Sequence, residues 1–394
     1  MIDVSRLCEG EALGPDRGAP GAHPSPRPPA ELGPVVIWNV TRRCNLRCLH
    51  CPWDSANRPY PGELTTAEAW RVIDDLAAFR VPGVVLSGGE PLMRADLLEL
   101  AAYAQHAGLP VTLATTGTLI DRRTALRLRA VGCAYVGISL DGLGPVNDRL
   151  RGVEGAFERA RAGLRHCLDA GQKVGLRFTL TRSTAGQLDA IFDFVEAEGI
   201  QRVSFSHPAH ARGGRVLVRD DLSLAETRRA LDTILARTQD FLGRGLPKEI
   251  LTMNNPADRV YFSLRLRPGD PARAARALAL PERNGDETDG SGAGIGNIDW
   301  LGDVHPHRFR QDVTLGNVRE RPFSEIWREC SHPILAGLEE RVRRLTGRCA
   351  GCRWLRCCGG GFRARAVQVF GDPWAADPAC YLTDEEIGLK EERV

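Results

Sequence analysis

Three cysteines stand close together in the stretch TRRCNLRCLHCPW, and their spacing is C-x3-C-x2-C: Cys44, Cys48 and Cys51. A metal site held by protein alone normally has four ligands. Three thiolates can instead bind three irons of a cubane iron-sulfur cluster and leave the fourth iron open to a small molecule. A zinc site completed by His50 is the alternative, but His50 adjoins Cys51 and is poorly placed to bind the same ion. We therefore expect a reactive cluster on this loop.

A second group of cysteines lies in RCAGCRWLRCCGGGFR and just beyond it. Four thiolates follow the spacing C-x2-C-x5-C-x21-C: Cys349, Cys352, Cys358 and Cys380. Cys357 could compete with its neighbour Cys358 as the third ligand. Four ligands make a closed site, and their spacing alone admits a structural zinc as well as a cluster.

Composition excludes several classes of protein. The 394 residues are 43% apolar and 26% charged, with a formal net charge of +2, which indicates neither a disordered chain nor a nucleic-acid-binding one. The first residues do not have the pattern of a secretory signal, and the sequence has no run of about 18 apolar residues that could span a membrane. We expect a cytoplasmic protein, in which twelve cysteines serve metals or remain thiols and do not form disulfides.

Strand-like and helix-like segments alternate and must position these groups. The apolar runs typical of strands are 35–40, 84–87, 110–116, 134–140, 173–180 and 202–206. The helix-like segments between them are near 66–80, 94–108, 121–131, 154–171 and 184–199. Six such repeats favour an α/β fold with parallel strands, either a partial (β/α)6 TIM-like barrel or a doubly wound sheet. In both, the carboxyl ends of the strands would bring Cys44, GGEP (88–91) and SLDG (139–142) to one rim.

Composition also divides the chain into four parts. Residues 1–33 are rich in Pro and Gly and are expected to form a flexible tail, and residues 34–220 the barrel. Residues 221–249 are expected to form a helical linker. Residues 250–394 form a loop-rich module with a hairpin-like stretch at 294–309, and such a module needs a metal centre to hold its shape.

The cysteine triplet CNLRCLHC, followed one strand later by GGEP, resembles the pattern of radical SAM enzymes. The resemblance implies that S-adenosylmethionine (SAM) binds the open iron through its amino and carboxylate groups. Reduction of the 4Fe-4S cluster, by a donor such as flavodoxin or ferredoxin, then yields a 5'-deoxyadenosyl radical that abstracts hydrogen from the substrate.

The same resemblance implies which residues bind SAM. Gly88 and Gly89 would let backbone groups approach the ligand, and Glu90, followed by Pro91, would face its ammonium group. Ser139 and Arg151 match positions that contact the methionyl or ribose part of SAM in related enzymes. No residue matches a catalytic proton acceptor, since Arg308 stands where sulfatase-maturating relatives have an acidic residue.

The C-terminal cysteines resemble the auxiliary cluster of SPASM and twitch modules. This resemblance selects Cys358 over Cys357 and implies a 4Fe-4S cluster in place of zinc. A full SPASM domain has a second auxiliary cluster, but His307 and Phe362 occupy two of its cysteine positions. We therefore expect one auxiliary cluster.

Four C-terminal stretches resemble radical SAM enzymes of tetrapyrrole processing, foremost those of haem d1 biosynthesis and next those of the alternative haem pathway: 254–266, 294–309, 315–327 and 357–387. The resemblance implies removal of propionates from an iron tetrapyrrole, didecarboxysirohaem. His207 and His210 could meet the substrate iron. Several arginines are candidates for binding its carboxylates: Arg212, Arg215, Arg265, Arg267, Arg308 and Arg310. A peptide-modifying SPASM enzyme, or an electron carrier that would not need GGEP, are the alternatives.

Overall fold

The computed structural model describes residues 1–9, 33–209, 219–279, 294–329 and 332–389. The chain divides into two compact units. The first unit comprises Gly14–Arg177 and Ser291–Ala336, and the second comprises Met1–Leu13, Phe178–Gly290 and Gly337–Val394.

The first unit contains the parallel strands that follow the tail. Their order in the sheet is β6-β5-β4-β3-β2, with neighbouring strands parallel, and β9, β10 and β11 continue the sheet beyond β2. The strands are β2 (Val35–Asn39), β3 (Val84–Ser87), β4 (Val111–Thr115), β5 (Tyr135–Ser139), β6 (Val174–Thr179), β9 (Ile295–Ile298), β10 (Asp303–His305) and β11 (Gly316–Asn317).

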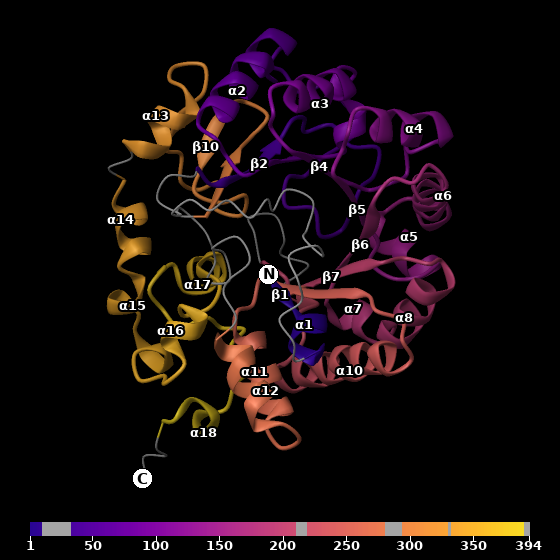
Figure 1. Ribbon diagram of the computed structural model, residues 1–394. Coiled ribbons are helices and arrows are strands. Elements are labelled where there is room, and N and C mark those ends of the chain that lie inside the picture. The colour runs from indigo at the N-terminus through magenta and orange to yellow at the C-terminus, as the bar shows by residue number, and fades with distance from the viewer. Residues whose placement is uncertain (10–32, 210–218, 280–293, 330–331, 390–394) are drawn as a thin grey trace. The chain divides into compact units, whose positions relative to one another are not determined.

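Helices connect these strands and lie along one side of them (Figure 1). They are α2 (Thr66–Ala78), η3 (Pro91–Met93), α3 (Leu97–His106), α4 (Arg122–Ala130), α5 (Pro145–Arg151), α6 (Ala156–Asp169) and α13 (Phe323–Arg328). Helix α2 begins with a reciprocal capping box between Thr65 and Glu68. Its buried Val72, Ile73 and Leu76 recur at helical spacing, so one apolar face packs on the sheet.

The second unit holds the remaining strands. β7 (Arg202–Ser206) and β8 (Glu249–Met253) are parallel, and β1 (Ile2–Asp3) pairs antiparallel with β8. The helices are α1 (Val4–Glu9), α7 (Arg182–Ala185), α8 (Leu188–Ala197), α10 (Leu224–Gly243), α11 (Ala257–Leu266), α12 (Pro271–Ala279), α15 (Arg341–Arg344), η5 (Gly347–Cys349), α16 (Leu355–Cys358), α17 (Arg363–Phe370) and α18 (Asp384–Ile387). Helix α14 (Pro333–Glu339) begins in the first unit and ends in the second, and the last two residues of β6, Phe178 and Thr179, also belong to the second unit.

The six strands and five helices expected from the sequence are confirmed as β2–β7 and α2, α3, α4, α6 and α8. The structure differs at residues 2–9, which were expected in the tail but form β1 and α1. Ser5 Oγ donates a hydrogen bond to Lys248 O and accepts one from Ile250 N, so these residues are tied to the edge of β8. Strands β9–β11, expected in the C-terminal module, belong to the first unit because β9 pairs in register with β2.

Among the helices of the described residues, none combines the length and the apolarity needed to cross a bilayer.

Candidate functional site

The loop after β2 carries the cysteine triplet. Cys44 is buried, and Cys48 and Cys51 are half-buried. Backbone hydrogen bonds hold the loop to the end of α5, where Arg47 N donates to Arg151 O and Leu49 N donates to Leu150 O. The amide of Leu46 also donates to Cys44 Sγ at 3.4 Å. Such amide contacts to sulfur are one means by which a protein tunes a cluster.

The environment of the thiols couples them to one another. Burial above all, together with charge on Glu90, Cys48 and Cys51, raises the pKa of Cys44 to about 12, against the lowering effect of the Leu46 amide. Burial also raises the pKa of Cys48, against the lowering effect of the Arg151 guanidinium. Three thiols as close together as these cannot all lose their protons unless a cation balances the charge. Iron is such a cation, because thiols bind a metal in their deprotonated form.

Asp141 follows strand β5, and its buried carboxylate contacts both His50 of the cysteine loop and Arg151 of α5. Its Oδ2 lies 2.7 Å from Arg151 Nη2 and 3.1 Å from His50 Nε2, and its backbone amide donates to Asn147 Oδ1. Arg151 Nη1 in turn lies 3.8 Å from Cys48 Sγ. Burial opposes the charge on Arg151, but Asp141 and Cys48 outweigh it and raise its pKa. Arg151, expected to contact SAM, is therefore also an electrostatic partner of the cluster loop.

Gly88 and Gly89 permit a close approach, but the approach in the structure is to the chain itself. Gly88 has φ of 143°, and a Cβ there would collide with the carbonyl oxygen of Thr41. A Cβ on Gly89 would collide with the carbonyl oxygens of Arg42 and Arg43. Gly89 N donates to Thr41 O and Glu90 N to Arg43 O, at 2.9 and 2.7 Å. The two glycines thus fasten the end of β3 to the start of the cysteine loop.

Glu90 is fully buried and its carboxylate already accepts hydrogen bonds. Oε2 accepts from both the amide and the hydroxyl of Thr116 at 2.7 Å, and Oε1 accepts from Thr115 Oγ1 at 2.7 Å and Leu92 N at 3.1 Å. Burial raises the pKa of Glu90, against the lowering effect of these donors. Pro91 follows it as the first residue of η3. Glu90 therefore organises the ends of β3 and β4.

We expect Glu90→Ala to retain iron and to bind SAM more weakly, because the change removes a carboxylate and no iron ligand. It should also destabilise the protein by about 1–3 kcal/mol, since the Thr115 and Thr116 donors lose their buried acceptor. Isothermal titration with SAM and chemical denaturation measure the two effects. Ser87→Ala, at the half-buried end of the same strand, is the control. Unchanged SAM affinity in Glu90→Ala would exclude this residue from the ligand site.

Some buried polar atoms near the cysteine loop have no hydrogen-bond partner among the described residues. Asn45 Nδ2 donates to Thr118 Oγ1 at 2.8 Å, while Asn45 Oδ1 and Asn39 Nδ2 are buried and have no hydrogen-bond partner among the described residues. Ser139 is half-buried at the carboxyl end of β5. Unsatisfied buried polar groups are costly, so ligand or water is expected beside them. Three clustered thiols and these polar atoms fit a cubane with an additional small polar ligand.

The four C-terminal cysteines meet around one pocket of the second unit. Cys349, Cys352, Cys358 and Cys380 all line it, together with Gly360 and Gly361. Cys357 is half-buried and does not line this pocket, which supports Cys358 as the third ligand. In the part of the chain that the structure describes, no group of three or more His, Cys, Asp or Glu side chains is arranged to hold a metal ion. A cubane differs from a single ion in that each thiolate binds a different iron.

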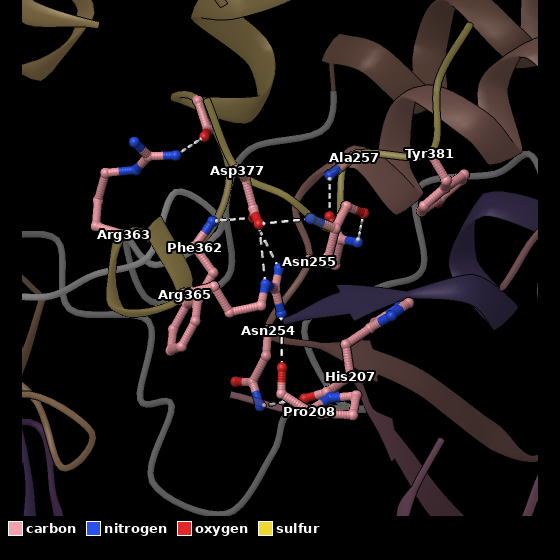
Figure 2. Close-up of polar contacts among 12 residues, drawn as sticks. His207, Pro208, Asn254, Asn255, Ala257, Phe362, Arg363, Arg365, Asp377 and Tyr381 are labelled. Carbon is pink, nitrogen blue, oxygen red and sulfur yellow. Dashed lines mark hydrogen bonds and ion pairs between the residues drawn. The ribbon is translucent and has the colours of Figure 1, made fainter. Parts of the chain in front are cut away.

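Asp377 and Arg365 hold the loops of this pocket in place (Figure 2). Both are fully buried and form a two-pronged ion pair, with N–O distances of 3.0 and 2.8 Å. Asp377 also accepts from Phe362 N, four residues after Cys358, and from Ala379 N, which precedes Cys380. Arg365 donates to Pro208 O at 3.0 Å, just after β7. One ion pair therefore connects two cysteine-bearing loops to the end of a strand.

A second hydrogen-bonded group adjoins the pocket. Tyr381, next to Cys380, donates to Asp258 Oδ1 at 2.7 Å, and His207 Nε2 lies 3.0 Å from Asp258 Oδ2. All three side chains are buried. His207, expected at the substrate, is thus oriented by a carboxylate.

The other substrate candidates differ in their surroundings. Arg212 and Arg215, like His210, lie outside the described residues. Arg265 pairs with Asp232 on the surface, and Arg310 pairs with Asp312 through three contacts of 2.9 to 3.2 Å. Arg308 has no carboxylate partner among the described residues.

Two cysteine positions of a full SPASM domain hold other side chains. His307 is buried, and burial followed by the charges of Arg308 and Arg310 lowers its pKa to about 3, so its imidazole is neutral near pH 7. Phe362 is buried beneath the Arg365 guanidinium, 5.2 Å from its ring centroid. Phe362 has no atom that can bind iron, and neither residue supplies the thiolate that a full SPASM domain has at its position.

Comparisons with known proteins agree with this arrangement. The profile of the Radical SAM superfamily matches residues 38–195, and that of SPASM, an iron-sulfur cluster-binding domain, matches residues 293–353. Fe-coproporphyrin III synthase of Methanosarcina barkeri is 48% identical over 361 residues, which are 91% of this chain and 90% of that protein. The chain belongs to the radical SAM superfamily. Pre-heme d1 synthase of Dinoroseobacter shibae is 46% identical over 372 residues, 93% of this chain and 91% of that protein.

Solved structures show the same fold. The crystallised anSMEcpe with bound AdoMet superposes with a TM-score of 0.70 at 18% identity, covering 90% of this chain and 96% of that one. This radical SAM enzyme therefore has the TIM-barrel-like α/β fold with an open sheet and a C-terminal SPASM module. Its cofactors are a 4Fe-4S cluster with SAM and an auxiliary iron-sulfur centre.

Some residues of the site were not predicted. Asp141 is the third residue of SLDG, and only its neighbour Ser139 was selected. Thr115 and Thr116 end a strand-like run, and Asp377 and Arg365 lie within the cysteine-rich stretch. The available signal was a polar residue at the carboxyl end of a strand, but such residues are common and their partners are distant in sequence.

Proposed function

We propose that this radical SAM enzyme acts in haem biosynthesis and removes propionate side chains from didecarboxysirohaem, as the enzymes of haem d1 biosynthesis do. The observation that carries the proposal is the 46% identity to a pre-heme d1 synthase across nine-tenths of both chains. That similarity extends through the C-terminal region, where the tetrapyrrole-type stretches lie.

The chemistry requires hydrogen abstraction from an unactivated carbon, which the cluster and SAM supply when bound. The residues of the chain prepare the site for it. Cys44, Cys48 and Cys51 would hold the cluster, and Asp141 orients His50 and Arg151 beside them. Glu90 fixes the neighbouring strand ends through Thr115 and Thr116. Binding of SAM to Glu90, Ser139 and Arg151 is part of the proposal.

His207 is proposed as a ligand of the substrate iron. Its Nε2 lies 3.0 Å from the buried carboxylate of Asp258, and the tautomer that donates from Nε2 would leave the Nδ1 lone pair to a metal. Metal-binding histidines commonly donate their other ring N–H to a carboxylate in this way, which fixes the tautomer and the ring orientation.

A second candidate is the formation of an iron coproporphyrin, which the 48% identity to Fe-coproporphyrin III synthase favours. The two functions differ in the mass of their products, since only the first removes propionates.

The test is an anaerobic incubation of the reconstituted enzyme with didecarboxysirohaem, SAM and a reductant. We expect 5'-deoxyadenosine to form faster with the tetrapyrrole than without it, and mass spectrometry to show a product that has lost propionate mass. Omission of SAM is the control. A product with the mass of iron coproporphyrin III would establish the second candidate. A ribosomal peptide that stimulates deoxyadenosine formation where no tetrapyrrole does would exclude both.

A further inference from the structure

A tyrosine beside an auxiliary-site cysteine is joined to His207 through one buried carboxylate. Tyr381 directly follows Cys380, and its hydroxyl donates to Asp258 Oδ1 at 2.7 Å. The other oxygen of this carboxylate, Oδ2, lies 3.0 Å from His207 Nε2. Tyr381, Asp258 and His207 are only 2%, 0% and 4% exposed, so bulk water does not compete for these contacts. One carboxylate is therefore shared between a phenol and an imidazole.

The backbone of His207 is held from both sides. His207 N donates to Met253 O at 3.0 Å, and Asn254 Nδ2 donates to His207 O at 3.1 Å. His207 directly follows β7, so it stands at the carboxyl end of a parallel strand, where ligands bind in barrels of this kind. With its backbone fixed, the orientation of its ring depends on Asp258.

The loop that bears Cys380 is fastened to the segment of Asp258 on both sides of the cysteine. After the cysteine, Tyr381 bonds to Asp258 itself. Before it, Ala379 O accepts from Asn255 Nδ2 at 3.0 Å, and Asn255 O accepts from the amide of Asp258 at 3.1 Å. The auxiliary site and His207 therefore belong to one hydrogen-bonded network within the second unit.

The two contacts of Asp258 have opposite effects on the basicity of His207. A carboxylate that accepts from one imidazole nitrogen makes the other nitrogen more basic, which strengthens a bond from that nitrogen to a metal. A phenol that donates to the same carboxylate draws part of its negative charge away from the imidazole. Asp258 would thus strengthen the bond from His207 to a metal, and the hydroxyl of Tyr381 would moderate it.

We propose that Tyr381 and Asp258 together set how strongly His207 binds the iron of the tetrapyrrole substrate, and with it the reduction potential of that iron. The inference rests on the proposed function, in which His207 is the iron ligand. Tyr381 and Asp258 act through His207 and are therefore positioning residues.

The experiment uses the anaerobically reconstituted full chain with didecarboxysirohaem as the probe. Visible absorption follows both the affinity for the ferric tetrapyrrole and the reduction potential of its iron. Asp258→Asn should bind the probe about ten- to hundredfold more weakly and raise the potential, because the imidazole loses its charged partner. Tyr381→Phe should lower the potential, because the undiminished charge of Asp258 then acts on His207. The two substitutions should therefore shift the potential in opposite directions.

Tyr261→Phe is the matched control. Tyr261 is also a buried tyrosine, and its ring meets that of Tyr381 edge-on, with the centroids 5.3 Å apart. Its hydroxyl donates to Asp232 Oδ1 at 2.8 Å. Loss of this hydroxyl should leave the affinity and the potential as they are in the parent.

Equal potentials in the parent, Tyr381→Phe and Asp258→Asn would overturn the inference. A rise of the potential in both variants would do so as well, since it indicates that the hydroxyl only supports the fold. The same holds if Tyr261→Phe shifts the potential as Tyr381→Phe does, because the effect is then one of packing. Should Asp258→Asn fail to fold, the sign of the shift in Tyr381→Phe, measured against Tyr261→Phe, decides the question.

Two results separate this inference from the proposed function. If His207→Ala binds the tetrapyrrole with unchanged absorption, another group binds the iron, and the inference fails while the substrate class stands. If the parent binds no tetrapyrrole, the proposed function itself fails.

Discussion

Protein in which Cys44, Cys48 and Cys51 are all replaced by alanine should keep about half of its iron and should no longer cleave SAM. Seven cysteines fall into one set of three and one set of four, so the reconstituted parent should hold two cubanes and about eight irons. The two sets belong to different compact units, so loss of one should leave the ligands of the other in place. Iron and sulfide analysis measures the first effect, and chromatography of 5'-deoxyadenosine the second.

The control for this experiment is Cys133→Ala. Cys133 is also a buried thiol, and burial raises its pKa to about 12, but it lies in neither set. Its replacement should leave iron content and SAM cleavage unchanged. A triple variant that loses all of its iron would show that the four remaining cysteines do not form an independent centre, and stoichiometric zinc in the parent would contradict an auxiliary cluster.

Asp377→Asn should destabilise the second unit and reduce its retention of iron. The change leaves the fully buried Arg365 guanidinium without a counter-charge, and breaking a buried ion pair from one side costs about 3–5 kcal/mol. It also weakens the acceptor that Phe362 N and Ala379 N share, so the loops bearing Cys358 and Cys380 lose their common anchor. We expect iron to fall toward the content of one cluster, while the SAM-binding cluster of the first unit remains.

The effect of this substitution should depend on pH. Burial alone would raise the pKa of Asp377, but Arg365 outweighs it and the pKa lies below its ordinary value of 3.8. A carboxyl group with a depressed folded-state pKa contributes stability above its unfolded pKa and loses it as pH falls through the folded value. Denaturation curves of parent and variant should therefore differ most above about pH 4 and converge in stronger acid.

Asp372→Asn is the matched control on the same loop. Asp372 accepts a hydrogen bond from Trp374 N at 2.8 Å, and an asparagine oxygen can accept it equally. Its cost should stay within about 0.5 kcal/mol. If Asp377→Asn unfolds at the same denaturant concentration as Asp372→Asn, the ion pair does not stabilise the auxiliary site.

The sequence was informative where local patterns carry the signal. Short runs of residues typical of strands, such as 84–87 and 202–206, carry their signal in residue type. Strands β3 and β7 could therefore be predicted without knowledge of their neighbours in space. The helix α5 was missed because it is short and lies within a segment that reads as loop. Strands β1 and β8 were missed because pairing of residues 2–3 with 251–252 joins segments about 250 positions apart, which no local pattern indicates.

The roles of individual site residues depended on distant partners in the same way. The motif predicts that Gly88 and Gly89 allow a close approach. In the structure the groups that lie close to them are the backbone carbonyls of Thr41 and Arg43, which the motif does not indicate. Glu90 accepts hydrogen bonds from Thr115 and Thr116, which lie 25 and 26 positions further along the chain, and the GGEP motif does not indicate these partners.

By itself the sequence determined the superfamily and the alternating α/β order and predicted the two cysteine sets, because ligand spacing and apolar periodicity are properties of contiguous residues. Only the tertiary structure decided which charges are balanced. Asp141 neutralises Arg151, Asp377 neutralises Arg365, and Arg308 has no carboxylate among the described residues. An arginine that pairs with a carboxylate stabilises the fold, whereas one without such a partner is a candidate for binding a ligand. The energy of the pair depends on the distance between the two charges in space and not on their separation in the sequence.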